Sequence, residues 1–341
     1  MCSSGGQSSG IGRIASGIGR IASGSLPMRV MHQREMRLPT LSQRRYSVCN
    51  AAGVVLKHMN ISQFSRPSTQ TKRYVRCYVQ RTLQLGASTF VQPVPARSVH
   101  LLDFEFGGPI EIRRFGTGAA RMAEPAALVG LQTYRQNQLL IRGNVETFVI
   151  VFHPAAVHQL FGLPPLDLIN CDHAADAVLG AAVSSLQQRL GNAHSFQERV
   201  RIADQFITSQ SFRARSNDPI EFAANEIMRT HGGCRIESLA HNIGQSISNF
   251  QRMFKLCVGI SPKLLARIVR FEAALKTKAA FPHLSWTKLA HEFGYHDQMH
   301  MIHDFKHLSG ETPTGILGQA KGVFAPQIDP GAQDNPERLL L

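Results

Sequence analysis

The chain contains LAHNIGQSISNFQRMFKLCVGISP at residues 239–262 and LAHEFGYHDQMHMIHDFKHLSGETP at residues 289–313. The two stretches share one pattern at an offset of 50 residues, which becomes 51 after one inserted residue. An internal repeat of this kind usually marks one structural unit per copy. Each copy predicts a helix, a glycine turn, a second helix, and a Gly-x-x-Pro stop before a new helix. This is the pattern of a helix-turn-helix.

Capping residues predict where these helices begin. Ser246 is expected to cap a helix over 247–258, Ser285 one over 286–293, and Asp297 one over 298–308. A longer helix is expected over 263–278, between the two copies. At the start of this region Asp218, with Glu221 three residues later, predicts a capping box. Together these elements predict a seven-helix domain over residues 213–320.

Helical geometry assigns the residues of the second helix in each copy to faces. In the first copy Ile247, Phe250, Phe254 and Cys257 are expected to be buried. The opposite face carries polar side chains long enough to reach bases or phosphates, namely Ser248, Gln251, Arg252 and Lys255. In the second copy the buried face includes Met301 and Phe305, and the open face includes His300 and His303.

At these residues the sequence resembles the AraC/XylS-type transcription regulators. The resemblance covers about residues 218–318, and both units match in order and spacing. It implies that two recognition helices enter successive major grooves on one face of the DNA. The long middle helix would set their separation, for which one helical turn of DNA is about 34 Å.

The resemblance also implies which residues read DNA. The candidate contacts are Ser248, Asn249, Gln251, Arg252 and Lys255 in the first unit, and Gln298, Met299, His300, Ile302 and His303 in the second. His303 departs from the family, which usually has Arg at this position. A neutral imidazole cannot neutralise a phosphate, so we expect the first unit to supply more of the affinity.

The net charge of +14 does not come from this region. Residues 1–84 hold 13 Lys and Arg against one acid, Glu35, which gives +12. Residues 85–341 hold 24 Lys and Arg against 22 acids, which gives +2. Residues 1–84, which include a perfect seven-residue repeat over 10–23, are therefore expected to form a basic, disordered tail. A second disordered tail is expected at 321–341.

Residues 85–212 are expected to form a β-rich sensor or dimerisation domain with following helices. Alternating apolar residues predict a strand over 99–106. The run 139–152, with Arg142-Gly143-Asn144 in its middle, predicts a hairpin. A short helix is expected to end at Gly162, and longer helices are expected over 176–190 and 196–207. The region more loosely resembles the sensor-type domain of a subset of AraC/XylS-type regulators. The expected fold class is α+β, with this domain followed by the all-α domain.

Metal and catalytic chemistry are not favoured by the sequence. His296, His300, His303 and His307 share a helical face, which could hold a metal, but DNA contact or solvent explains that face better because no carboxylate or cysteine accompanies it. None of the six cysteines forms a C-x-x-C pair, and His291 and His296 stand one residue too far apart for H-E-x-x-H. We therefore expect no metal, no cofactor and no enzyme activity.

The expected function is a cytoplasmic, sequence-specific transcription regulator that binds double-stranded DNA. Its expected partners are RNA polymerase, a small-molecule effector at the N-terminal domain, and a second copy in a homodimer, with no membrane. The family resemblance is compatible with an activator, and the sequence leaves repression open as well. The alternative is a DNA-modifying or repair enzyme that carries an AraC-type appendage. It would require a reactive cysteine, and Cys49, Cys77 and Cys171 lie in no recognisable motif.

Overall fold

The computed structural model describes residues 48–49, 55–56 and 59–320. All of these residues belong to one compact unit that spans Leu41–Leu341. The repeat at residues 10–23 and the predicted tail at 321–341 lie outside the described residues. No described helix is long and apolar enough to cross a membrane.

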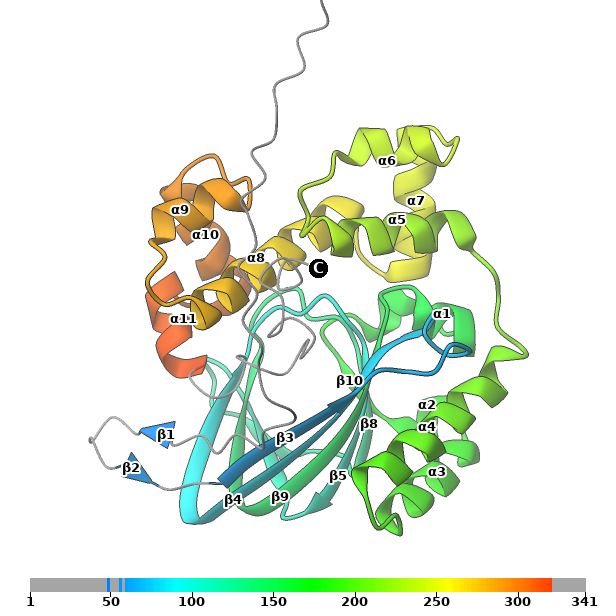
Figure 1. The fold of residues 1–341 in the computed structure, drawn as a ribbon, viewed down its shortest axis with the longest axis vertical. Coiled ribbons are helices and arrows are strands. Elements are labelled where there is room, and N and C mark those ends of the chain that lie inside the picture. The colour runs from blue at the N-terminus through cyan, green and yellow to red at the C-terminus, as the bar shows by residue number, and fades with distance from the viewer. Residues whose placement is uncertain (1–47, 50–54, 57–58, 321–341) are drawn as a thin grey trace, which may run out of the picture. The chain divides into compact units, whose positions relative to one another are not determined.

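An eight-stranded antiparallel sheet forms the N-terminal part of the described chain (Figure 1). Its main path runs in the order β10-β8-β5-β9-β4-β3, while β6 pairs with β9 and with β7. The strands are β3 (Met59–Ser65), β4 (Val75–Val94), β5 (Leu101–Gly107), β6 (Ile110–Arg114), β7 (Ala120–Met122), β8 (Ala126–Val129), β9 (Asn137–Phe152) and β10 (Asp172–Ala174). Separately, β1 (Val48–Cys49) pairs with β2 (Val55–Leu56).

Two expectations about this region are wrong. The sheet begins at Met59 rather than after residue 84, because β3 and most of the first half of β4 lie within the stretch expected to be a disordered tail. The expected hairpin over 139–152 is instead one continuous strand, β9. Gly143 lies at a register shift in this strand rather than at a turn. The shift is opposite Gln84 and Thr89 of β4.

Short helices follow the sheet and cover one of its faces. They are α1 (Ala156–Phe161), the 3-10 helix η1 (Pro165–Leu168), α2 (Ala175–Leu179), α3 (Ala181–Gly191) and α4 (Phe196–Ser211). Gly162 ends α1 in the left-handed conformation, as expected. The single helix expected over 176–190 is interrupted at Gly180, whose φ of 79° separates α2 from α3.

Strand β5 shows how the sheet divides its two faces. Leu102 and Phe104 are fully buried and pack in the cluster that also holds Leu186 and Leu190 of α3. Because side chains alternate along a strand, Asp103 and Glu105 point to the other face. That face therefore carries charged groups although it also lies inside the protein.

Seven helices form the C-terminal part, as predicted: α5 (Asp218–Arg229), α6 (Ile236–Asn242), α7 (Ile247–Val258), α8 (Pro262–Ala280), α9 (Trp286–Glu292), α10 (Gln298–Ser309) and α11 (Pro313–Ala320). The side chains of Ser246, Ser285 and Asp297 accept the predicted capping hydrogen bonds. The capping box at Asp218 is wrong. Asn217 is the N-cap, without a side-chain bond, and Asp218 is already helical and pairs with Arg73.

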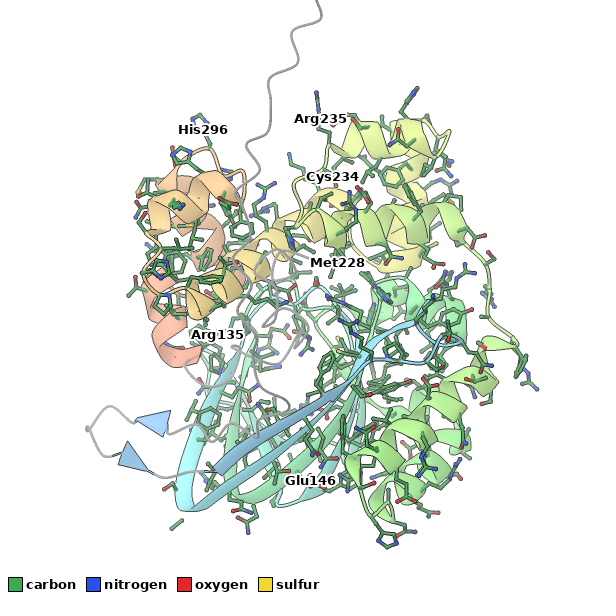
Figure 2. All side chains as sticks on the ribbon, viewed as in Figure 1. Arg135, Glu146, Met228, Cys234, Arg235 and His296 are labelled. Carbon is green, nitrogen blue, oxygen red and sulfur yellow. The ribbon has the colours of Figure 1, made fainter. Side chains whose placement is uncertain are left out.

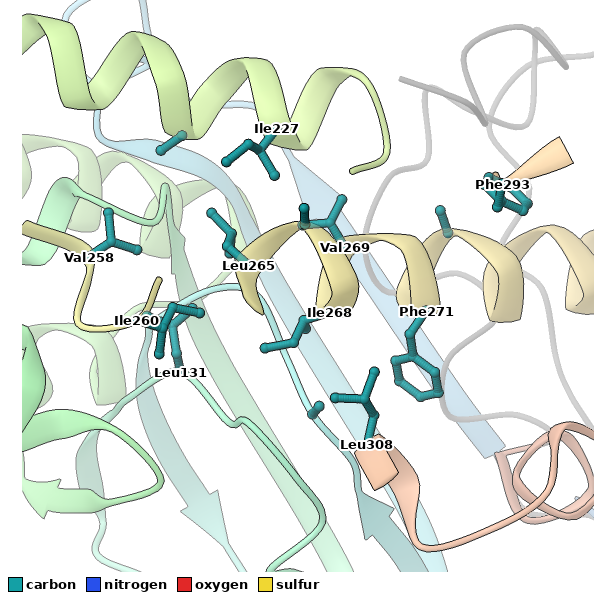
Figure 3. Packing of buried hydrophobic residues seen from close by; sticks show 14 of the residues in the cluster. Leu131, Ile227, Val258, Ile260, Leu265, Ile268, Val269, Phe271, Phe293 and Leu308 are labelled. Carbon is teal, nitrogen blue, oxygen red and sulfur yellow. The ribbon is translucent and has the colours of Figure 1, made fainter. Parts of the chain in front are cut away.

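The helical part packs directly on the loops of the sheet. Ala96 and Leu131 belong to the same buried cluster as Leu265 and Ile268 of α8 (Figure 3). The backbone N–H of Ala96 donates to the carbonyl of Leu308 at 2.8 Å. Hydrophobic burial and a backbone hydrogen bond therefore join the two parts within one compact unit.

Polar contacts join the same two parts at their edges. Arg135, only 7% exposed, lies 3.7 Å from a Glu311 oxygen and donates to Gln319 of α11. Glu221 of α5 accepts from Arg73 and from Gln159, each at 2.8 Å. The first and the last helix of the C-terminal part, α5 and α11, are thus each tied to the N-terminal part by polar contacts.

Gly232 tests the packing of α8 against the loop after α5. Its φ is 74°, and a Cβ built there would lie 2.1 Å from the carbonyl oxygen of Ala266. Gly232→Ala should therefore lower the free energy of unfolding by about 2–4 kcal/mol, from left-handed strain plus the clash. Denaturant unfolding of the full chain measures this.

Gly244→Ala is the matched control, because Gly244 has a φ of 67° but open space around a built Cβ. It should cost only the backbone strain, about 1–2 kcal/mol. Equal losses in the two variants would contradict the packing at Gly232.

Candidate DNA interface and effector cavity

Helix α7 presents a polar open face. Ser248, Gln251, Arg252 and Lys255 are exposed, while Phe250 and Phe254 are fully buried. These exposures match the two expected faces at every position except Ile247, which was expected to be buried and is 40% exposed. Ile247 is the first residue of the helix, so it lies beyond the edge of the packed face.

Asn249 is half-buried on α7, and its side chain forms hydrogen bonds to neighbouring residues. Its Nδ2 donates to Gln245, and its Oδ1 accepts from Arg252 at 2.9 Å. This bond orients the Arg252 guanidinium along the helix surface. A pre-oriented guanidinium loses less conformational entropy when it binds a base edge or a phosphate.

Helix α10 presents the second candidate face. Gln298, Met299, His300 and His303 are exposed, and Met299 is 70% exposed. Ile302 is half-buried at the edge of this face. The turn before the helix carries His296, whose backbone N–H lies 3.4 Å from Nδ1 of His300 (Figure 2).

Helix α8 connects the two units through one side chain in particular. Arg270 donates to the carbonyl of Gly232, after α5, at 3.0 Å and to the carbonyl of Gly294, in the second turn, at 3.4 Å. Its guanidinium also lies 5.3 Å from the centre of the buried Tyr295 ring. One arginine therefore contacts the backbone just before the first helix-turn-helix unit and the turn within the second.

A second contact of α8 involves a buried carboxylate. Asp304 of α10 is 2% exposed, and its Oδ1 accepts from Arg267 at 2.7 Å. Sequence reasoning missed this pair, although an acid within an otherwise buried helical face is a signal for such a partner. The pair fixes the rotation of α10 about its axis, and so the direction of its open face.

A cavity of about 220 Å³ lies on the face of the sheet opposite α3 and α4. Its lining combines aliphatic strand residues with charged ones, including Arg81 on β4 and Asp103 and Glu105 on β5. Arg97, from the segment between β4 and β5, lines it too. Sequence reasoning missed the cavity, because Arg81 falls in the stretch expected to be a tail.

Burial shifts the pKa values of the cavity carboxyls. Desolvation raises the pKa of Asp103 to about 6, against the opposing effect of Arg81 and Arg97. Desolvation, with the nearby Asp103 charge, raises the pKa of Glu105 to about 8. Burial also lowers the pKa of both arginines. At neutral pH Glu105 therefore holds its proton in most molecules.

Helix α8 forms one wall of this cavity. Glu272 and Lys276 are among the lining residues, together with Phe271 and Leu275. Glu272 accepts from the backbone N–H of Ser98 at 3.1 Å and from the Ser98 hydroxyl. The helix that connects the two helix-turn-helix units thus also faces the interior of the sheet part.

Comparison with known proteins identifies the C-terminal part. Residues 239–319 match the family model described as a helix-turn-helix domain. This stretch holds both recognition helices, α7 and α10, and therefore is a DNA-binding domain by class. The family is the AraC type, so the resemblance expected from the sequence is confirmed for these residues. No curated protein matches the chain.

Solved structures give weaker likenesses. ToxT from Vibrio cholerae O395 is 11% identical and matches 72% of this chain and 99% of its own, with a TM-score of 0.41. ToxT from Vibrio cholerae strain SCE256, bound to an unsaturated fatty acid, is 10% identical over 73% of this chain and 98% of its own, with a TM-score of 0.40. The AraC-like transcriptional activator CuxR is 10% identical over 60% and 84%, with a TM-score of 0.22.

The Arg267–Asp304 pair predicts a large stability effect for one substitution. Arg267→Ala would leave the Asp304 carboxylate buried without its partner, which costs about 3 kcal/mol in the free energy of unfolding. Arg229→Ala, which breaks the exposed pair with Glu226, should change it little. Denaturant unfolding of both variants makes the comparison. Similar small losses of unfolding free energy would show that the Arg267–Asp304 pair does not stabilise the folded protein.

Glu105 predicts a pH dependence of stability. Its pKa in the folded protein is about 8, above the ordinary value of 4.5, so the folded state binds the extra proton. This contribution is complete below pH 4.5 and is lost as the pH rises through about 8. Between pH 6 and 8 the Glu105 contribution should therefore fall, while His153 and His231, whose pKa values burial lowers to about 4, contribute in the opposite direction.

Glu105→Gln removes this titration. Because the histidine contribution is the same in both proteins, we expect the unfolding free energy of the variant to rise relative to that of the parent protein between pH 6 and 8. Denaturant unfolding at the two pH values measures the difference. An identical pH dependence in both proteins would mean that Glu105 ionises normally.

Proposed function

We propose that the chain is a sequence-specific transcription regulator that reads two successive major grooves and responds to a small molecule in the sheet cavity. The observation that carries the DNA part is the pair of exposed polar faces on α7 and α10 within one AraC-type helix-turn-helix domain. Arg252 is suited to a guanine edge and Gln251 or Gln298 to adenine, because these side chains match those bases bidentately.

The proposed contacts are unequal in the two units. The first unit offers two permanent cations, Arg252 and Lys255, on its open face. The second offers Met299, His300 and His303, with Lys306 toward its end. Phosphate contacts supply most of the affinity of a DNA-binding protein, so the first unit should dominate binding.

The effector part of the proposal is supported by the cavity and by its wall. A concave site with aliphatic lining and a few convergent polar groups is the usual form of a small-molecule site. Because α8 lines it, an occupant would touch the same helix that spaces α7 from α10. Contact with RNA polymerase and a homodimer on DNA belong to the same proposal.

The rival function, a DNA-repair enzyme with this domain as an appendage, is less well supported. Such chemistry requires an accessible thiolate, which a lowered pKa would provide. Desolvation instead raises the pKa of Cys234 and Cys257. Cys77 is buried, and the exposed Cys171 lies in no recognisable motif. Cys257 also accepts a hydrogen bond from Asn217 inside the domain. We therefore propose a regulator without catalytic activity.

Arg252→Ala tests the DNA face. We expect it to weaken binding to the operator by about 1–3 kcal/mol and, if Arg252 reads a base, to relax specificity at one position. A gel-shift titration on the genomic binding site, found first by footprinting, measures both effects. Unchanged affinity would contradict the assignment of this face.

Two further variants complete this experiment. Arg189→Ala removes an exposed arginine from α3, outside the DNA-binding domain, and should leave operator binding unchanged. His303→Arg restores the residue usual in the family, and should strengthen binding and steepen its salt dependence by about one phosphate contact. If His303→Arg leaves the operator affinity and its salt dependence unchanged, α10 does not contact the phosphates at this position.

A further inference from the structure

Four ionisable side chains, namely Arg81, Arg97, Asp103 and Glu105, line the sheet cavity without pairing. Among the described residues, none forms a side-chain hydrogen bond or an ion pair with Arg81, Arg97 or Glu105. Asp103 accepts from the backbone N–H of Phe104, but its Oδ1 has no partner. Arg81 is only 8% exposed, so its charge is held inside the protein. Unpaired buried charges are costly, which makes this arrangement unusual for a purely structural role.

The ladder of the sheet explains why these groups do not meet. Thr147 of β9 stands between Arg81 of β4 and Glu105 of β5 in one cross-strand row. The two backbones are therefore two strand spacings apart, about 10 Å. Asp103 lies in the next row, opposite Val149. Arg81 and Glu105 thus approach the cavity from strands on either side of β9 and leave a gap between them, while Arg97 enters beside Gln132, with which its backbone pairs.

Three of the other charged lining groups have partners. Asp172 pairs with Arg121, and Glu272 accepts from Ser98. Lys276 also has an interaction, and Glu124 lines the cavity near the β7–β8 connection. Apart from Glu124, which is exposed, the groups without partners are therefore two arginines and two carboxyls. Arg97 Nε and Nη2, like Asp103 Oδ1, have no hydrogen-bond partner.

We propose that the cavity binds a small zwitterion of the amino-acid class, with its carboxylate at Arg81 and Arg97 and its ammonium at Asp103 and Glu105. This inference rests on the proposed function and names the ligand of its cavity. A molecule with both charges satisfies both sets at once, whereas a ligand of one sign would leave the other set buried and unpaired.

The size and the remaining lining favour an apolar side chain on this ligand. A cavity of about 220 Å³ is the volume of about seven water molecules, which is the scale of a single amino acid. Val79 and Val149 lie beside the charged row, and Leu139 and Ile112 continue the lining. These residues offer no hydrogen-bonding groups, so they suit an aliphatic or aromatic side chain.

Thermal denaturation and calorimetric titration of the full chain with the standard L-amino acids test the proposal. We expect one or more amino acids with apolar side chains to raise the unfolding midpoint. For L-leucine the matched probes are 4-methylpentanoate, which lacks the ammonium, and isopentylamine, which lacks the carboxylate. Each amino acid that binds should do so at least about tenfold more tightly than its two analogues.

Proton linkage distinguishes a zwitterion from a simple anion. An ammonium beside Glu105 favours its ionised form, so binding at pH 7 should release protons and tighten as the pH rises from 6 to 8. A ligand with a carboxylate but no ammonium would instead take up protons on binding, and its affinity would fall as the pH rises. Titration in buffers of different ionisation enthalpy measures the proton number. Proton uptake would overturn the proposal, as would the failure of every amino acid to bind.

Two variants locate the ligand. Arg81→Gln and Asp103→Asn should each weaken binding about 10- to 100-fold, because each removes a charged hydrogen-bond partner. Arg189→Gln, on the surface of α3, should leave binding unchanged. Denaturant unfolding first confirms that each variant folds. Unchanged affinity in both cavity variants would overturn the assigned site.

Operator binding separates this inference from the proposed function. Gel shifts of the parent chain require no ligand assignment, so they can succeed while every amino acid fails to bind. That result would overturn the ligand class alone. Loss of sequence-specific DNA binding would instead overturn the proposed function, whatever the cavity binds.

Discussion

The separation of the two recognition helices is the constraint on which this protein depends, and α8 maintains it. A helix rises by a fixed amount per residue, so the 19 residues of α8 form a spacer that does not stretch. Arg270 contacts the backbone of the loop before α6 and of the turn between α9 and α10, and Arg267 contacts Asp304 of α10. DNA presents its major grooves at a fixed interval, which demands a rigid spacer of this kind.

The two faces of the sheet differ in what they pack against. One is a hydrophobic core, and the other lines a cavity next to α8. One face buries aromatic side chains such as Phe104 and Phe148 under α3 and α4, which makes it a conventional core. The other face carries charged groups around a cavity whose far wall is α8. Strand alternation lets a single strand, β5, serve both faces, with neighbouring residues of opposite character. The stable core and the polar cavity therefore share the same backbone.

The sequence predicted the helical part closely, because its signals are local. Ser246, Ser285 and Asp297 cap helices wherever they occur, and helical periodicity assigned Phe250 and Phe254 to the buried face. Prediction from the sequence failed where the interacting residues lie far apart in the chain. Composition placed Arg81 in a tail, although Arg81 of β4 pairs with Thr147 of β9, 66 residues later. The glycine within β9 imitated a turn, and the acid Asp304 gave no indication of which arginine on α8 would meet it.

The wall that α8 contributes to the cavity has a thermodynamic consequence for the DNA. If an occupant of the cavity changes the free energy of the helix that spaces the two recognition helices, the two binding equilibria are linked. Such linkage is reciprocal, so the operator must change the affinity of the cavity by the same factor as the occupant changes the affinity for the operator. An operator bound to α7 and α10 would thus act as an effector of the sheet, and molecules on different operators could sense the same small molecule at different concentrations.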